Sequence, residues 1–392
     1  MAFPCLLPVL ALAVCMVGAA EFMLSPMLAP LADAFATTPA RASGLVSAYA
    51  LSYAVAAPLM GWFSDRAGRR RVLLTALLLF ALDGIALTLA PTLHVAMALR
   101  ILGGLAAAAT IPTVFALIAD LVPPARQAGA MGGVMLGMTA GIAAGPAVAG
   151  VLADGFGWRA PFLVTAGGCL AAFLAGCHVL PRNFPRSGDS QEKFRNAQTS
   201  SGILLPLIAK GAWNGSAVAG YVLAGYVLAG EVLRLRYGLG VAGIGATLSV
   251  FGLGLAVGNL LAGRASQCFA REESVLMLAT ALVTVAMTLF TAAILGLPGS
   301  LVCLLAWGAA IGIAAPSSTA ILARRAAAAK GQVLAISESF NNLAVLMLMP
   351  VAAGSLAVHG TVPAALLVGG CCLAGVALTV ADRLMTARGA RV

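Results

Sequence analysis

The chain has 392 residues, of which 61% are hydrophobic and only 9% are Asp, Glu, Lys or Arg, and its formal net charge is +10. A soluble domain is about half apolar and about a quarter charged, so this composition excludes an ordinary soluble protein. The apolar segments are continuous rather than alternating and reach the ~20 residues that a helix needs to cross a bilayer, which also argues against a transmembrane barrel.

The sequence predicts an all-α integral membrane protein with twelve transmembrane helices in two six-helix halves. The N-terminal half is residues 1–180, with spans at 6–32, 43–63, 72–91, 95–119, 128–153 and 159–180. A polar stretch at 181–202 is expected to form a cytoplasmic linker. The C-terminal half is residues 203–392, with spans at 211–233, 241–263, 274–296, 299–322, 332–358 and 362–382. Secondary transporters are often built from two such repeats, with the substrate site between them.

Basic residues set the expected orientation. If both termini are cytoplasmic, most of the 23 Lys and Arg residues fall in cytoplasmic loops, as expected in a cell (inner) membrane. The positive charge is scattered over short loops, so it is no argument for nucleic-acid binding. The eight Cys and three His residues show no metal-ligand spacing, and no phosphate-binding loop is visible. We therefore expect no metal, no cofactor and no enzymatic activity.

The first span contains Glu21, one of four ionisable residues placed deep in predicted spans. Such a residue costs about 2.5–3.5 kcal/mol on insertion scales and is a functional candidate by default. Gly18, Glu21 and Ser25 share one helical face. A carboxyl group in a dry cavity can bind and release a proton near neutral pH, which suits a proton carrier. The alternative is a structural acid paired with Arg100 or capped by hydroxyl groups.

The second span ends in "GWFSDRAGRRR" (61–71), which holds five charges in eleven residues. Gly68 permits a tight turn between two helices, and Asp65 at a helix end can pair with the arginines or with a neighbouring helix terminus. The eighth span ends in "GRASQCFAR" (263–271), which repeats part of this pattern at the equivalent place of the second half. The two halves therefore retain a trace of a common origin.

Spans three and four contribute Asp83 and Arg100. The residues three and four positions from Asp83 are apolar on both sides, so Asp83 needs a partner from another helix and is either structural or linked to protons. Arg100 shares a face with Gly103 and Gly104, which leaves room around its guanidinium group. A fixed cation there would favour the ionised form of an acid brought close to it, so its movement could trigger proton release.

The fifth span carries a glycine every four residues from 129 to 145. Such a stripe lets another helix approach at backbone distance, and Pro146 removes a backbone donor and permits a kink. We expect Gly141 and Gly145 to lie where another helix crosses closely. The seam, including Gly150, would seal one side of a cavity, with Gly→Ala mild and larger side chains severe.

In the second half, "ISESFNNL" (336–343) places Glu338, Asn341 and Asn342 on one helical face. This patch could contact a substrate, but it could equally serve helix–helix hydrogen bonds or pair with a charge of the loop after span two. Asn214 and Tyr221 of span seven offer polar and aromatic contacts for a ligand, although aromatic residues in spans more often pack or anchor at the interface.

Several of these stretches resemble motifs of the major facilitator superfamily. Gly61, Asp65, Arg66, Gly68 and Arg69 match the motif between spans two and three of that family. The resemblance implies a cytoplasmic charge cluster that helps to hold the outward-open state and breaks when the inner side opens. It also implies transport by alternating access.

Other stretches match motifs of the same family only in part, but they indicate the same family. "ALRILGGLAAA" resembles the span-four arginine motif, with Gly103 where the family has a polar residue. "GIAAGPAVAGVL" (141–152) resembles the span-five motif of exporters that exchange against an ion, with Ala149 in place of a glycine. The first span is similar to the twelve-span drug:proton antiporters, including chloramphenicol and arabinose-type exporters, in which an acid in span one serves in proton and cationic-drug recognition.

These patterns favour a proton-coupled exporter of small drug-like compounds or metabolites, with a role in antibiotic resistance. Its expected partners are a small-molecule substrate, protons and the lipid bilayer, and a monomer is expected. The alternatives are a dedicated exporter of a sugar, nucleoside or siderophore, or a proton-symporting importer. A membrane enzyme or receptor would need a ligand cluster or a loop nucleophile, and the sequence contains neither pattern.

Overall fold

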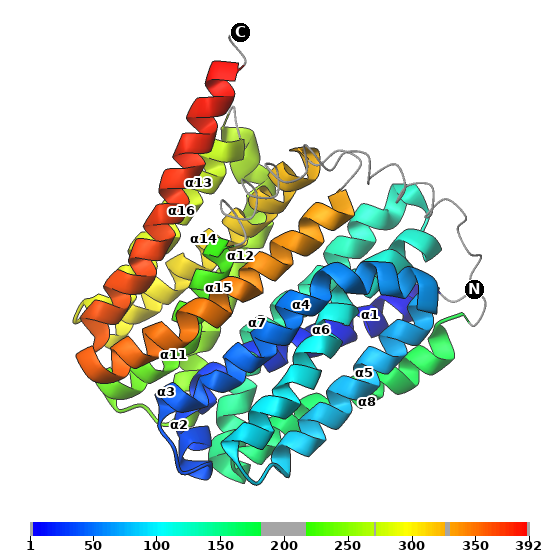
Figure 1. The fold of residues 1–392 in the computed structure, drawn as a ribbon. Helices are drawn as coiled ribbons and strands as arrows, with labels where there is room; N and C mark the ends of the chain where they lie inside the picture. Colours follow the sequence, from blue (N-terminus) through cyan, green and yellow to red (C-terminus); the bar gives the residue numbers. More distant parts are fainter. Residues whose placement is uncertain (1–2, 182–216, 270–271, 326–329, 390–392) are drawn as a thin grey trace. The chain divides into compact units, whose positions relative to one another are not determined.

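The structure is a computed structural model that describes residues 3–181, 217–269, 272–325 and 330–389, and every regular element in them is a helix (Figure 1). The chain divides into two compact units, Met1–Ser187 with Leu233–Ser249, and Gly188–Val232 with Val250–Val392. The helices are α1 (Phe3–Phe22), α2 (Leu24–Ala34), α3 (Pro39–Ala42), α4 (Gly44–Ala67), α5 (Arg69–Thr88), α6 (Leu93–Leu121), α7 (Pro124–Phe156), α8 (Arg159–Val179), α11 (Ala217–Tyr237), α12 (Val241–Cys268), α13 (Glu272–Ala292), α14 (Leu297–Arg325), α15 (Lys330–His359) and α16 (Thr361–Gly389).

The helices follow the order of the predicted spans, and their number is roughly consistent with twelve. Among the described residues, ten helices are long and apolar enough to cross a membrane, and the bent pair α1 and α2 would make eleven. Helix α11 lies at the place of the seventh predicted span. The all-α, twelve-span fold class therefore agrees with the structure. The predicted linker lies outside the described residues except for Pro181, and the division into halves stays a prediction.

The first predicted span, 6–32, is wrong as a continuous helix. Helix α1 ends at Phe22, α2 begins at Leu24, and the two parts meet at a bend of 56°. Pro26 lacks the N–H group that would donate to the Phe22 carbonyl, so the helical ladder cannot pass this point unbroken. The bend places Glu21 at the end of a helix rather than in the middle of one.

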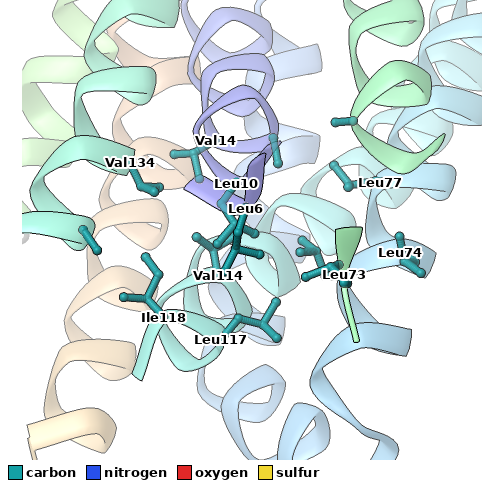
Figure 2. Close-up of a cluster of buried hydrophobic side chains, with 14 of the residues drawn as sticks. Leu6, Leu10, Val14, Leu73, Leu74, Leu77, Val114, Leu117, Ile118 and Val134 are labelled. Atoms are coloured by element: carbon teal, nitrogen blue, oxygen red, sulfur yellow. The ribbon is translucent and has the colours of Figure 1, made fainter. Parts of the chain in front are cut away.

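The first unit is built from helices that cross closely around an apolar core. Helix α1 packs along α7, α4 along α6, and α5 against α6 and α8. Figure 2 shows the core, to which α1, α5, α6 and α7 all contribute; its members include Leu10, Val14, Leu77, Val114, Leu117 and Val134. Lipid is as apolar as leucine, so close packing rather than water exclusion holds these helices together.

The second unit relies on glycines where α12 crosses α14. A Cβ atom on Gly254 would overlap the Leu305 carbonyl, and one on Gly308 would overlap the Phe251 carbonyl. The contact is reciprocal, because each helix presents glycine to the backbone of the other. Beside it, Trp307 is fully buried among aromatic rings, with its centroid 5.5 Å from that of Phe251.

Candidate functional site

A buried ion pair lies at the centre of the first unit. Asp83 of α5 and Arg100 of α6 each have side chains only 2% exposed, and Arg100 Nη1 lies 4.0 Å from Asp83 Oδ2. The guanidinium carbon of Arg100 lies 4.6 Å from the centroid of the Tyr49 ring of α4. Buried charges persist when they are paired, so Arg100 is the partner that Asp83 was expected to need. Tyr49 was not singled out from the sequence.

Glycine makes room for this pair. A Cβ atom on Gly103 would overlap Asp83 Oδ2, and a Cβ atom on Gly104 would overlap Ser52 Oγ and the Tyr49 carbonyl. The small residues beside Arg100 were expected to leave space around the guanidinium group. The structure shows that the space is used by the Asp83 carboxylate and by the backbone of α4.

The cluster has unused hydrogen-bonding capacity. Asp83 Oδ1, Arg100 Nε and the Tyr49 hydroxyl are buried, and none of them has a hydrogen-bond partner among the described residues. Each such group costs about 1–3 kcal/mol, so three in one place are not explained by stability. Buried ionisable groups retained at such a cost are candidates for a functional site.

Glu21 belongs to the same cluster. It is half-buried near the end of α1, and Glu21, Asp83 and Arg100 all lie within electrostatic range of the Tyr49 hydroxyl. Residues of four helices (α1, α4, α5 and α6) thus interact electrostatically at one tyrosine, and three of them are the proposed proton-coupling residues. Their roles in coupling stay a prediction.

The arginines after α4 hold the ends of two other helices. Arg69 forms an ion pair with Asp120 near the end of α6 and donates a hydrogen bond of 2.6 Å to the Ala116 carbonyl. Arg70 donates to the carbonyls of Cys177 and Leu180, at 2.9 Å and 3.1 Å, at the end of α8. The last carbonyls of a helix lack intrahelical partners and carry its negative dipole end, so Arg70 suits the end of α8. Arg69 instead neutralises Asp120 in the last turn of α6.

The turn that presents these arginines depends on Gly68, whose φ is +91° between α4 and α5. Arg66 is exposed. The surroundings of Gly61 and the side chain of Asp65 are outside what the structure describes, so the expected pairing of Asp65 stays a prediction. Asp120, which the sequence reasoning missed as a partner, lies 51 positions from Arg69, and no local pattern links the two.

Helix α1 crosses α7 at backbone distance. A Cβ atom on Gly141 would overlap the Cys15 carbonyl and lie 2.9 Å from the Ala19 nitrogen, and one on Gly145 would lie 2.9 Å from Ala19 Cα. The close crossing expected at Gly141 and Gly145 is confirmed. At Gly141 the geometry argues against the expectation that alanine is mild, because even one added carbon atom meets backbone, and the effect of the substitution stays a prediction.

Helix α7 also contacts the start of α12, which belongs to the same compact unit. A Cβ atom on Gly150 would lie 2.6 Å from the Val241 carbonyl, and one on Gly245 would overlap the Pro146 carbonyl. Gly129 and Gly133, in contrast, have nothing within 4 Å of an added Cβ. The stripe is therefore covered over its second part only, and its sealing role stays a prediction.

Part of the polar patch of the second unit serves its own helix. Glu338 of α15 is exposed, and the Asn341 side chain donates a hydrogen bond to its carboxylate. Asn342 is buried and donates to the Glu338 backbone carbonyl at 3.1 Å, so its amide serves its own helix. Asn214 and the side chain of Tyr221 lie outside the described residues. Within the described ranges, no group of three or more His, Cys, Asp or Glu residues could hold a metal ion.

Comparison with known proteins shows which family the chain resembles. An uncharacterised MFS-type transporter of Bacillus subtilis (strain 168), YceJ, is 30% identical over 259 residues, which are 64% of each chain. Multidrug resistance protein 2 of the same organism is 33% identical over 136 residues, which are 35% of this chain and 34% of that one. The chain thus aligns with less than two thirds of the length of each relative.

A solved structure, the D-xylose-proton symporter, superposes with a TM-score of 0.79 at 17% identity and covers 97% of both chains, which shows a shared fold. Residues 10–235, more than half of the chain, match the model of the Major Facilitator Superfamily. The motif between α4 and α5, the arginine of α6 and the glycine seam of α7 lie inside the matched range. The chain belongs to the Major Facilitator Superfamily.

Proposed function

We propose that the protein is a secondary active transporter that exports small drug-like compounds or metabolites in exchange for protons, by alternating access. The observation that carries the proposal is the cluster of Glu21, Tyr49, Asp83 and Arg100, which places two acids and one cation inside an apolar unit. The multidrug resistance protein among the relatives supports export of drug-like compounds.

The cluster offers a route to proton coupling through competition for one cation. Asp83 holds Arg100 at the edge of ion-pair distance and keeps unused acceptor capacity on Oδ1. Protonation of Asp83 would remove its negative charge and free the guanidinium group to attract Glu21. A proton taken up by one acid would then favour proton release from the other, which is the exchange that a coupled transporter needs.

The remaining motifs supply the conformational part of the proposal. Arg69 and Arg70 fix the ends of α6 and α8 beside the turn at Gly68, which leaves Asp65 to act as the latch that breaks when the inner side opens. The crossing of α1 and α7 at Gly141 keeps the unit tight while it moves. We place the protein in the inner membrane as a monomer with both termini in the cytoplasm.

The test is proton-coupled transport by the purified protein in proteoliposomes that contain a trapped pH-sensitive dye. Addition of a substrate from a panel of drug-like compounds should drive proton movement across the membrane in the opposite direction. Glu21→Gln should abolish this movement while the protein stays folded and inserted. Undiminished proton-driven transport by Glu21→Gln would refute the assignment of Glu21.

A sugar substrate is the second candidate, because the superposed symporter carries D-xylose and shares the fold. The same vesicles distinguish the two. D-xylose that moves together with protons, combined with no response to the drug panel, would overturn export and favour the importer.

A further inference from the structure

The hydroxyl group of Tyr49 is not needed for packing. Tyr49 is only 2% exposed, and its hydroxyl is buried with no hydrogen-bond partner among the described residues. A buried polar group without a partner is unfavourable, and phenylalanine would fill almost the same space without that cost. The contact with Arg100 does not need the hydroxyl either, because the guanidinium carbon lies over the ring, 4.6 Å from its centroid.

The second unit contains the same kind of crossing with a phenylalanine in place of the tyrosine. A Cβ atom on Gly104 of α6 would overlap the Tyr49 carbonyl of α4, and one on Gly308 of α14 would overlap the Phe251 carbonyl of α12. Four residues before its glycine, α6 carries Arg100, whereas α14 carries a buried leucine. The crossing therefore forms with phenylalanine beside an apolar residue and has tyrosine beside a buried cation. The hydroxyl accompanies the charge and not the crossing.

Tyr49 lies among ionisable groups of four other helices. Its hydroxyl is within electrostatic range of Glu21, Asp83, Arg100 and Cys169, which come from α1, α5, α6 and α8. The guanidinium group only donates hydrogen bonds, and a thiol is a weak donor and a weak acceptor. A tyrosine hydroxyl both donates and accepts, so it can take a proton from one neighbour while it gives its own proton to another.

The two acids of the cluster differ in their access to a proton. Glu21 is half-buried, whereas the Asp83 side chain is only 2% exposed and its Oδ1 atom has no hydrogen-bond partner among the described residues. A proton must therefore reach Asp83 through another group. Arg100, its ion-pair partner, cannot supply one, because a guanidinium group is not deprotonated in proteins. The Tyr49 hydroxyl is a neutral donor and acceptor within electrostatic range of both acids.

We propose that the Tyr49 hydroxyl passes protons between Glu21 and Asp83. The Glu21 carboxyl gives its proton to the Tyr49 oxygen, while the O–H bond of Tyr49 breaks and its proton bonds to Asp83 Oδ1. Tyr49 stays neutral, Glu21 becomes ionised and Asp83 becomes neutral, so one proton has moved and the net charge is unchanged. This inference deepens the proposed function, because it supplies the path between the two acids, and it rests on that function for transport only.

The experiment follows protonation of Asp83 in the full chain, purified in detergent, by time-resolved infrared spectroscopy after photolysis of a caged acid. The band of the protonated Asp83 carboxyl is identified by its loss in Asp83→Asn. Tyr49→Phe keeps the ring, so we expect it to slow the rise of this band by about a hundredfold, as loss of a positioned proton-transfer group does, and to leave the final amplitude unchanged. The matched control is Tyr226→Phe, the same change at a fully buried tyrosine of the second unit, which should alter neither rate nor amplitude.

A double-mutant cycle tests the path itself. Glu21→Gln should slow the rise as much as Tyr49→Phe does, and the double variant should be no slower than either. An unchanged rate in Tyr49→Phe, an equal loss in Tyr226→Phe, or no Asp83 band in the wild type would overturn the relay.

The relay and the proposed function can fail separately. If Tyr49→Phe slows protonation of Asp83 but wild-type vesicles show no proton-driven transport, the relay stands and the proposed function fails. If transport is proton-driven while Tyr49→Phe protonates Asp83 at the wild-type rate, the relay alone fails.

Discussion

Gly141→Ala is the sharpest test of the close crossing between α1 and α7. The added Cβ atom would overlap the Cys15 carbonyl and lie 2.9 Å from the Ala19 nitrogen, and both are backbone atoms that cannot rotate away. Ordinary van der Waals contact needs about 3.5–4.0 Å, so α1 and α7 must separate by at least several tenths of an ångström. Overpacking of this kind costs about 1–3 kcal/mol.

The matched control lies on the same helix. A Cβ atom on Gly133 meets nothing within 4 Å, so Gly133→Ala changes only the backbone entropy and should stabilise α7 by about 0.5–1 kcal/mol. At about 2–4 °C per kcal/mol for a domain of 150–250 residues, the two alanine variants should differ in melting temperature by roughly 3–16 °C. Both variants are unfolded by heat in the same detergent, so the effect of the detergent on the melting temperature cancels in the difference between them.

A second measurement asks whether the crossing is a seal. Proteoliposomes with a trapped pH dye should show a faster proton leak with Gly141→Ala than with wild type, and no change with Gly133→Ala. If Gly141→Ala is as stable and as proton-tight as Gly133→Ala, the close crossing contributes neither to stability nor to the proton seal. The reasoning from backbone overlap would then be refuted.

Three further outcomes follow from the same structure. Asp83→Asn removes a charge but keeps the volume, so it should abolish proton-driven transport and preserve substrate exchange measured in the absence of a proton gradient. Proton-driven transport by this variant would assign coupling to Glu21 alone. Arg70→Gln should lower the melting temperature by several degrees, because two charge-assisted hydrogen bonds to the end of α8 are lost; an unchanged melt would make Arg70 a topological charge. Asp65→Asn should shift the population toward the inward-open state, as read by spin-label distances across the cytoplasmic face, and an identical distance distribution would contradict the latch.

The helices could be predicted because the bilayer leaves so few choices. A run such as 95–119 has to be helical in lipid, and α6 covers all of it. The bend between α1 and α2 was also present in the sequence, since Pro26 follows Phe22 at the spacing that breaks one hydrogen bond. Continuous hydrophobicity outweighed that signal and gave one long span.

The pairing within the site could not be read in the same way. Asp83 and Arg100 lie on antiparallel neighbouring helices, and the register of α5 against α6 depends on the turn between them rather than on any period. The glycine stripe shows the same limit. Gly133 and Gly141 have identical spacing in the sequence, yet only Gly141 is covered, because the path of α1 decides which glycine meets backbone.

Because only part of the glycine stripe packs against other helices, α7 is held rigidly along one part of its length and not along the other. From Gly137 onward it contacts the backbone of α1 and then the start of α12, while at Gly129, Gly132 and Gly133 no neighbouring atom lies within 4 Å of an added Cβ. Glycines also resist bending less than other residues, because they have no side chain to pack. A force on the N-terminal end of α7 would therefore bend it between residues 129 and 137 and leave the packed part straight.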